Sequence, residues 1–194
     1  MKVLEESGIA FRTHLMAFSD HGDMHGSHGM FCKMTVHEES IRTPMIVSGE
    51  QQVYDGRSVG RVNAPMNHVD IAPTTLGLCG ISKPDWMWGY DYSGLRLSKR
   101  SRDGQPDNAY LQSVIPTGHS HSINKAWRGL VTRDGWKYAC FENMSWAMFN
   151  LNDDPYEQMN LAQNNVYRAE RKKLIDRLKQ WGADVGDPFA IPAD

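Results

Sequence analysis

The sequence predicts an α/β protein in two parts, and three observations support this fold class. Two short, mostly apolar runs at residues 14–19 and 44–48 have the length and continuity of buried strands. Four strand-like segments with short links follow in the second half, which predicts an antiparallel sheet. An amphipathic stretch at residues 165–181 predicts a C-terminal helix that covers one face of that sheet.

The first residues of the chain have the pattern of the C-terminal end of a helix. Residues 3–8 have the pattern of its last turns, and Gly8 is a suitable left-handed terminator. Thr35 and Glu38 have capping-box spacing, which predicts a short helix from Thr35 to about Ile41. A further helix begins at Asp70 and ends before a glycine. We expect its apolar face to consist of Ala72, Leu76 and Cys79.

The second part is defined by turn signals between apolar segments. Its four strand candidates are residues 109–115, 127–132, 136–141 and 146–151. The pair Asp134-Gly135 predicts a tight hairpin between the second and third of them. The final helix is expected to end at Gly182. Its apolar stripe contains Leu174, Ile175, Leu178 and Trp181.

The composition excludes several function classes. The 194 residues carry a formal net charge of -2, so there is no basic surface for nucleic acid and no polybasic segment for a membrane. No apolar run reaches the roughly 18–20 residues of a membrane span, and the first ten residues do not have the pattern of a signal peptide. The three cysteines are far apart, which argues against a zinc ribbon or a disulfide scaffold.

Candidate ligands gather where the first predicted strand ends. Asp20 and His21 stand at the start of a Gly-rich loop that also contains His25 and His28. Ligands of open α/β sheets collect at the carboxyl ends of strands, so this is a favourable place for a site. A carboxylate suits a hard divalent ion, whereas several imidazoles suit a transition metal such as zinc.

The same residues resemble the second signature region of the sulfatases, in the alkaline-phosphatase superfamily. The likeness lies in the run from Phe18 to Lys33, with its Ser-Asp-His-Gly start, and continues through residues 38–47. Residues 68–76 resemble the helix that follows in that family, and residues 127–138 and 149–161 resemble its C-terminal subdomain. Four segments in the family's order make the resemblance specific.

The resemblance implies a fold and two domains. Residues 1–105 would be the incomplete C-terminal part of the sulfatase α/β catalytic domain, which is built on an alkaline-phosphatase-like mixed sheet. Residues 106–194 would be a small four-stranded antiparallel subdomain with a terminal helix. The Gly-, Ser- and Pro-rich stretch at residues 83–108 marks the expected boundary between them.

The resemblance also implies roles for individual residues. Asp20 and His21 match metal ligands, and the expected ion is calcium, with magnesium as the alternative. Lys33 matches a catalytic lysine that contacts the sulfate and helps to protonate the leaving group. His119 and His121 belong to the subdomain that borders the substrate cleft, so they are candidate substrate contacts.

The nucleophile of the family is expected outside this chain. Sulfatases carry a Cys-x-Pro-x-Arg or Ser-x-Pro-x-Arg motif, whose first residue becomes formylglycine, in an N-terminal portion that the 194 residues do not contain. We therefore expect the chain to be the C-terminal portion of a sulfuric ester hydrolase, inactive by itself, whose partner is a sulfate-ester small molecule or glycan. Unpaired sheet edges would favour self-association.

Two other functions stay open at this point. A phosphonate or phosphate ester hydrolase of the same superfamily would share the Asp-His ligands and a comparable lysine. A non-catalytic, truncated metal-binding module would instead use His25 and His28 with a preference for zinc. The compartment is unknown: family members are often exported, and the chain shows no signal peptide.

Overall fold

The computed structural model describes residues 2–49 and 60–193 and divides the chain into two compact units. The first unit contains the described residues of 1–20 and 44–106, and the second contains residues 21–43 and 107–194. The predicted domains, 1–105 and 106–194, remain a prediction. The segment His21–Thr43 groups with the C-terminal residues in the structure.

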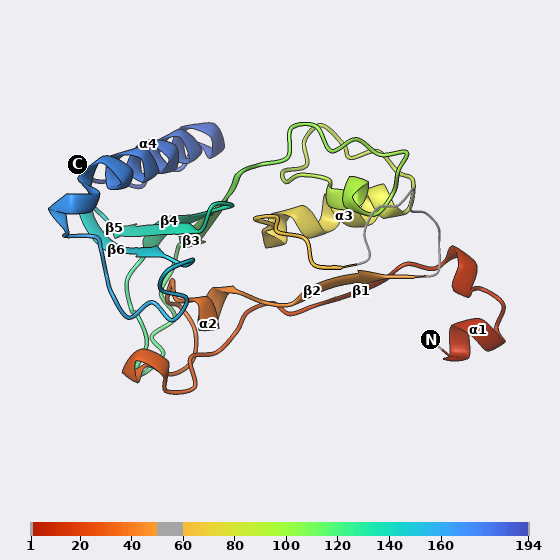
Figure 1. The fold of residues 1–194 in the computed structure, drawn as a ribbon, viewed down its shortest axis with the longest axis horizontal. Helices are drawn as coiled ribbons and strands as arrows, with labels where there is room; N and C mark the ends of the chain where they lie inside the picture. Colours follow the sequence, from red (N-terminus) through yellow and green to blue (C-terminus); the bar gives the residue numbers. More distant parts are fainter. Residues whose placement is uncertain (1, 50–59, 194) are drawn as a thin grey trace. The chain divides into compact units, whose positions relative to one another are not determined.

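The first unit is built around a two-stranded antiparallel ribbon. Its elements are α1 (Lys2–Glu6), β1 (Leu15–Phe18), β2 (Met45–Ser48) and α3 (Ile71–Leu78). The predicted strands are confirmed, and Leu15 lies opposite Ser48 in the ribbon (Figure 1). The expectation that they are buried is wrong for this chain, because the side chains of Phe18 and Ile46 are 50% and 58% exposed. A two-stranded ribbon has no further layer to cover its apolar side chains.

The helix α3 buries a different face from the one its sequence predicts. A 3-10 turn, His68–Asp70, precedes it, and Asn67 caps this turn. The apolar positions Ala72 and Cys79 are exposed. The buried residues of the helix are Pro73, Thr74, Gly77 and Leu78. Gly77 is packed against the side chains of Asp91 and Ser93, so the polar segment after the helix, and not an apolar layer, covers it.

The second unit contains the predicted four-stranded antiparallel sheet, with strand order β3-β4-β5-β6. Its elements are α2 (Glu38–Ile41), β3 (Asn108–Ser113), β4 (Trp127–Thr132), β5 (Trp136–Phe141), β6 (Met144–Asn150) and α4 (Arg168–Val185). The turn at Asp134-Gly135 joins β4 to β5 as predicted, and Gly135 has a φ of 92°.

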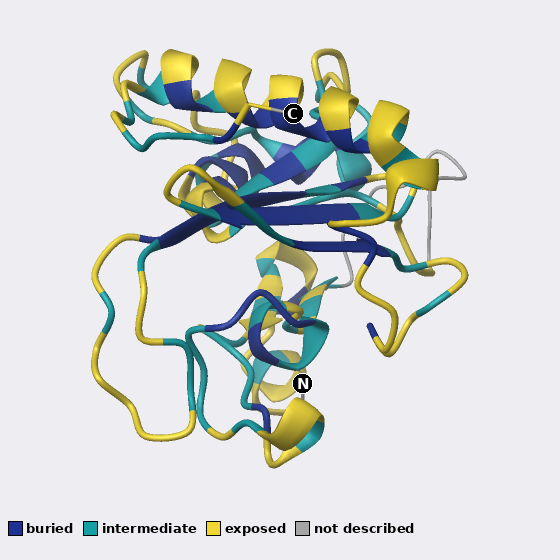
Figure 2. Cartoon of the chain, turned by 90° about the vertical axis from the view of Figure 1, so that its left-hand side faces the viewer, coloured by how far each residue is buried: buried dark blue, intermediate teal, exposed yellow. Residues whose placement is uncertain are grey.

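The sheet of the second unit is covered on both faces. On one face, Leu130, Tyr138 and Met148 pack against the stripe of α4 formed by Leu174, Ile175 and Leu178. On the other face, Ala139, Ala147 and Phe149 pack against Val36 and, at the edge of the cluster, Ile41. Figure 2 shows the buried side of α4 turned toward the sheet and its exposed side turned to solvent. Successive side chains of a strand point to opposite faces, so β5 serves both cores.

Two predicted helix boundaries are corrected. The helix α4 runs past Gly182 to Val185 and ends at Gly186, which has the left-handed φ of 67° that a terminator requires. The capping box at Thr35 is absent from α2, whose N-cap is His37 and has no side-chain capping bond. Thr35 instead places its hydroxyl 2.7 Å from Nδ1 of His37.

Over the parts of the chain that the structure describes, no helix combines the length and the apolar character that crossing a bilayer requires.

Candidate functional site

The end of β1 presents Asp20 on the surface of the first unit. Asp20 follows the strand by two residues, and the hydroxyl of Ser19 lies 3.4 Å from its Oδ1. The ring of His68 donates from Nε2 to the carbonyl oxygen of Ser19 at 2.9 Å, which ties the start of the 3-10 turn before α3 to this strand end. Asp20 is exposed.

In the second unit, His21 and Lys33 form a direct contact across the Gly-rich loop. The Nζ of Lys33 lies 2.7 Å from Nε2 of His21, and Nδ1 of His21 lies 2.8 Å from the carbonyl oxygen of Gly22. A carbonyl oxygen only accepts, so Nδ1 carries the proton of the ring, and Nε2 offers its lone pair to the ammonium group. The two predicted residues are thus brought together, and the imidazole nitrogen that faces Lys33 has the form that also binds a metal ion.

Backbone hydrogen bonds hold the loop between these residues, one to α2 and one within the loop. The amide of Gly22 donates to the carbonyl of Ser40 at 2.8 Å, and the amide of Met24 donates to the carbonyl of Cys32 at the same distance. Met24 is buried and anchors the loop. A side chain at Gly22 would collide with the carbonyl oxygen of Glu39, so only glycine permits this close approach.

Asp23 orders the next turn of the loop, as its residue type predicts. Its Oδ1 accepts from the amide of His25 at 3.0 Å, and Nδ1 of His25 lies 3.4 Å from the same oxygen. His25 is exposed and directed to this local partner.

The segment that contains His119 and His121 contacts the loop that presents Lys33. The amide of Phe31 donates to the carbonyl of His121 at 2.9 Å, and their rings meet edge to face with centroids 6.2 Å apart. The hydroxyl of Ser122 donates to the carbonyl of Lys33. Both histidines are exposed. His121 therefore lies near Lys33 by way of Phe31, although almost 90 residues separate them in the sequence.

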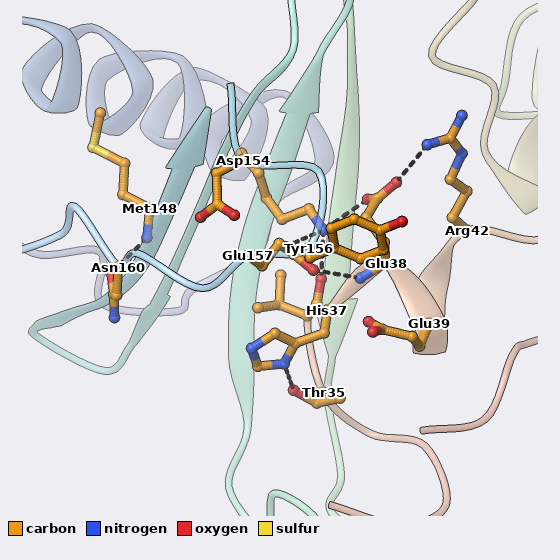
Figure 3. Close-up of polar contacts among 12 residues, drawn as sticks. Thr35, His37, Glu38, Glu39, Arg42, Met148, Asp154, Tyr156, Glu157 and Asn160 are labelled. Atoms are coloured by element: carbon orange, nitrogen blue, oxygen red, sulfur yellow. Dashed lines mark hydrogen bonds and ion pairs between the residues drawn. The ribbon is translucent and has the colours of Figure 1, made fainter. Parts of the chain in front are cut away.

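A buried ion network, which was not among the features predicted from the sequence, fixes the segment that follows Lys33. Lys137 of β5 is fully buried, and its Nζ lies 2.7 Å from both Glu38 and Glu157. The same ammonium donates to the carbonyl of Val36 at 2.9 Å, and Glu157 accepts from the amide of Glu38 at 2.7 Å. Figure 3 shows Glu38 and Glu157 close together in this network, with Arg42 at its outer edge. Glu38 also pairs with Arg42, four residues later, at 3.3 Å, and this pair is the outer edge of the network.

The sequence carried one signal of this network. Lys137 stands in a predicted strand whose other residues are aromatic or small. An ammonium group is rarely buried unless carboxylates or carbonyls surround it. A lysine in such a strand therefore predicts a buried carboxylate partner, although the sequence does not say which one.

Two histidines stack beside this network. The ring centroids of His28 and His37 are 4.2 Å apart. Burial, and next the neighbouring His28, lower the pKa of His37 to about 4. Glu39 accepts from the hydroxyl of Ser27 at 2.5 Å. Burial by itself raises the pKa of Glu39, but the bond from Ser27 and the two histidines outweigh it, and the pKa lies below its usual range.

This region also contains a group of side chains that a metal ion could bridge. Within residues 2–49 and 60–193, the ligand atoms of His28, Glu39 and Glu157 lie within 4.8 Å of one another. However, the ammonium group of Lys137 already pairs with Glu157, and Ser27 already donates to Glu39. A second cation would meet the repulsion of Lys137 at this point. We therefore interpret the cluster as a polar anchor of the loop.

The comparisons with known proteins identify the chain's relatives. Residues 26–184 match the family described as "N-sulphoglucosamine sulphohydrolase, C-terminal". Among curated proteins, the ulvan-active sulfatase of Formosa agariphila is 30% identical over 192 residues, which cover 97% of this chain and 36% of that protein. The N-acetylglucosamine-6-O-sulfatase of Bacteroides thetaiotaomicron is 26% identical over 182 residues, which cover 93% of this chain and 32% of that protein.

A solved structure has the same fold over nearly the whole chain. It is that of a protein in complex with its substrate D-glucosamine-2-N,6-O-disulfate, with a TM-score of 0.80 and 27% identity. The match covers 96% of this chain and 37% of that one. The chain thus spans about a third of the length of the relatives that it matches.

Proposed function

The chain belongs to the sulfatase family as a C-terminal portion, and from this premise we propose that it supplies the metal-binding and sulfate-binding side of a sulfuric ester hydrolase site. The observation that supports the proposal most is the contact between Lys33 and His21, directly after the strand end that presents Asp20. A carboxylate, an imidazole and an ammonium group then follow one another within one loop.

The charges suit an anionic ester. A sulfate ester develops negative charge on its leaving oxygen as the S–O bond breaks, so the site must supply positive charge and a proton there. Lys33 has three N–H donors, and only one of them is needed for His21. We propose that these donors bind the sulfate oxygens and that one of the protons passes from Nζ to the leaving oxygen, which leaves Lys33 as a neutral amine.

Asp20 and His21 would hold a divalent metal ion. Their donors fit this role in part: the carboxylate of Asp20 is exposed, and Nε2 of His21 carries a lone pair that accepts from Lys33 in this structure, so the ion would replace that hydrogen bond. Calcium binds six to eight oxygen ligands, so two residues are not enough and other ligands must complete the site. We propose calcium as the ion, with magnesium as the alternative. When bound, it would supply positive charge to the sulfate group.

The nucleophile has a separate origin in this proposal. The sequence contains no Cys-x-Pro-x-Arg or Ser-x-Pro-x-Arg run, so we place the formylglycine outside these 194 residues. The role of this chain is then to bind and orient the ester and to protonate its leaving group.

We propose a sulfated sugar as the substrate class. One relative is named for N-acetylglucosamine 6-O-sulfate, and the similar solved structure contains a disulfated glucosamine. His119 and His121 lie on an exposed segment that is bonded to the loop of Lys33, which supports the proposal that they contact the sugar. Imidazoles at this position can donate to sulfate or hydroxyl oxygens.

Substrate selection tests the reaction class. The protein purified from its native gene should release sulfate from glucosamine 6-sulfate, and the variant Asp20→Asn should lose most of this activity. Equal or faster release of phosphate from an aryl phosphate, or cleavage of an aryl phosphonate, would favour the phosphonate or phosphate hydrolase instead.

Metal selection tests the remaining alternative. Isothermal titration of calcium and zinc into the same protein should show calcium binding that depends on Asp20 and His21. The matched control is the double variant His25→Ala/His28→Ala, which should bind calcium as the wild type does. A preference for zinc that this control abolishes would identify a metal-binding module instead.

A further inference from the structure

Two tryptophan side chains are exposed on a loop of the first unit. Trp86 is 77% exposed and Trp88 is 61% exposed, although tryptophan is among the residues with most to gain from burial. Both belong to the segment from Ile81 to Tyr90, between α3 and the next turn. Nothing in the roles proposed above uses this loop.

The loop is held in a fixed shape by its own hydrogen bonds. The amide of Met87 donates to the carbonyl of Pro84 at 3.0 Å, which closes a turn with Trp86 inside it. The ammonium group of Lys83 donates to the carbonyls of Met87 and Gly89, at 2.8 and 3.0 Å, and so encloses Trp88 between two bonded residues. The backbone that presents the two indoles is therefore ordered before any ligand arrives.

A chain of contacts connects the loop to the strand end that presents Asp20. The amide of Tyr90 donates to Asp70 at 2.7 Å, and Gly89 is packed against the backbone of Val69. The turn that contains both residues begins at His68, whose ring donates to the carbonyl of Ser19. Trp88 is thus two residues before Tyr90, whose amide is bonded to Asp70 of the 3-10 turn. The same turn is bonded to Ser19, the residue before Asp20.

We propose that Trp86 and Trp88 form a sugar-binding platform of the first unit, linked by these contacts to the strand end that presents Asp20, on which a pyranose ring of the substrate stacks. The inference rests on the proposed function for the substrate class, a sulfated sugar. The apolar C–H face of a pyranose matches an indole face, and the ring hydroxyls need polar partners at the rim. Asp85 precedes Trp86 in the same turn and is exposed, so its carboxylate can accept from a hydroxyl group.

The size of the patch favours a sugar over a protein partner. A tryptophan buries about 150–250 Å² at most, so two of them provide far less than the roughly 800 Å² per partner of a stable protein interface. Charged residues also flank the indoles, at Lys83 and Asp85. One or two stacked sugar rings fit such a surface.

Indole resonances in an NMR titration of the 194-residue chain test the platform. The six tryptophans give six Nε1–H signals, and the variants Trp86→Phe and Trp88→Phe identify the two of interest. The probes are glucosamine 6-sulfate, unsulfated glucosamine and methyl sulfate. We expect both sugars to shift the signals of Trp86 and Trp88, whereas methyl sulfate leaves them unchanged. The buried Trp127 is the internal control and should not respond.

Calorimetry gives the matching affinity. The variant Trp86→Ala/Trp88→Ala should bind glucosamine 6-sulfate about tenfold more weakly, with an unchanged far-ultraviolet circular dichroism spectrum that shows the fold is intact. Equal affinities of variant and wild type, a response to methyl sulfate alone, or a change in sedimentation that marks the indoles as a protein contact would each overturn the platform.

The outcomes separate the platform from the proposed function. If sugars shift the two indole signals but the native protein hydrolyses no sulfated sugar, the platform stands and the sulfatase proposal fails. If sulfated sugar is hydrolysed but the indoles do not respond, the platform fails by itself.

Discussion

At the scale of single residues, the side chains in and around the site are positioned in two ways: by the backbone of a loop, and by contacts from the sheet. Lys33 and His21 are brought together by a loop that backbone hydrogen bonds hold in place, among them those from Gly22 to Ser40 and from Phe31 to His121. Lys137 instead reaches the following segment from the sheet. The residue types at the first location are readable from sequence because ligands collect at strand ends. The position of Lys137 is not, because a lysine is expected on the surface.

His37 should make stability depend on pH. In the unfolded chain its imidazole takes up a proton near pH 6.5, whereas in the folded protein burial delays this until about pH 4. As the pH falls from 6.5 to 4, the unfolded state gains a proton that the folded state does not, so folding loses stability over this range. We expect a loss of about 1–3 kcal/mol from this residue.

Urea denaturation at a series of pH values measures the effect. The variant His37→Gln should have a flatter profile between pH 4 and 6.5, and the exposed control His119→Gln should follow the wild type. A profile of His37→Gln as steep as that of the wild type would show that another group carries the pH dependence.

At the scale of elements, close backbone contacts decide where glycine is required. Replacing Gly22 by alanine places a methyl group against the carbonyl oxygen of Glu39, so we expect a destabilisation of about 1–3 kcal/mol. The same change at Gly182, inside α4, meets only ordinary contacts at 3.6 Å and should stabilise the helix by about 0.5–1 kcal/mol. Thermal unfolding of both variants compares them directly; a neutral Gly22→Ala would contradict the packing described for this loop.

Removing one partner of the ion network around Lys137 should lower the free energy of unfolding far more than breaking a surface ion pair. The variant Lys137→Met leaves Glu157 buried beside an apolar side chain, and we expect a loss of about 3–5 kcal/mol. The control Lys172→Met removes an exposed pair with Asp176 and should change stability by less than about 1 kcal/mol.

A double-mutant cycle separates the network from simple packing. The variant Lys137→Met/Glu157→Gln removes both charges, so it should lose less stability than the sum of the two single variants. Additive losses would mean that the two side chains act independently of each other.

The elements themselves were largely predictable, and the reasons are local. The stripe Leu174, Ile175 and Leu178 repeats at helical spacing, and Asp134-Gly135 requires a tight turn, so both are encoded within a few residues. The end of α4 was predicted four residues too early because Gly182 has the residue type of a terminator, but it lies inside the helix and Gly186 ends it. The presence of a glycine in the sequence does not show whether it is packed inside a helix or ends the helix in a left-handed conformation.

At the scale of the whole molecule, the contacts that complete the site join distant parts of the sequence. The bond from Phe31 to His121 and the burial of Glu157 beneath Lys137 leave no local pattern, so sequence periodicity could not predict them. Burial of the strands was misjudged for a related reason: an apolar run shows that a strand can be covered, not that a covering layer is present in the chain. Phe18 and Ile46 remain exposed, and association through them stays a prediction.

We propose that Lys33 supplies positive charge and a proton to a sulfate ester. The most direct measurement is the turnover of glucosamine 6-sulfate by the protein from the native gene, with Lys33→Met and the exposed control Lys179→Met compared under the same conditions. We expect Lys33→Met to lower kcat/KM by about 10²–10³-fold, whereas Lys179→Met leaves it unchanged. If both variants retain the wild-type turnover of the sulfated sugar, Lys33 does not act on the ester and the proposed site is wrong.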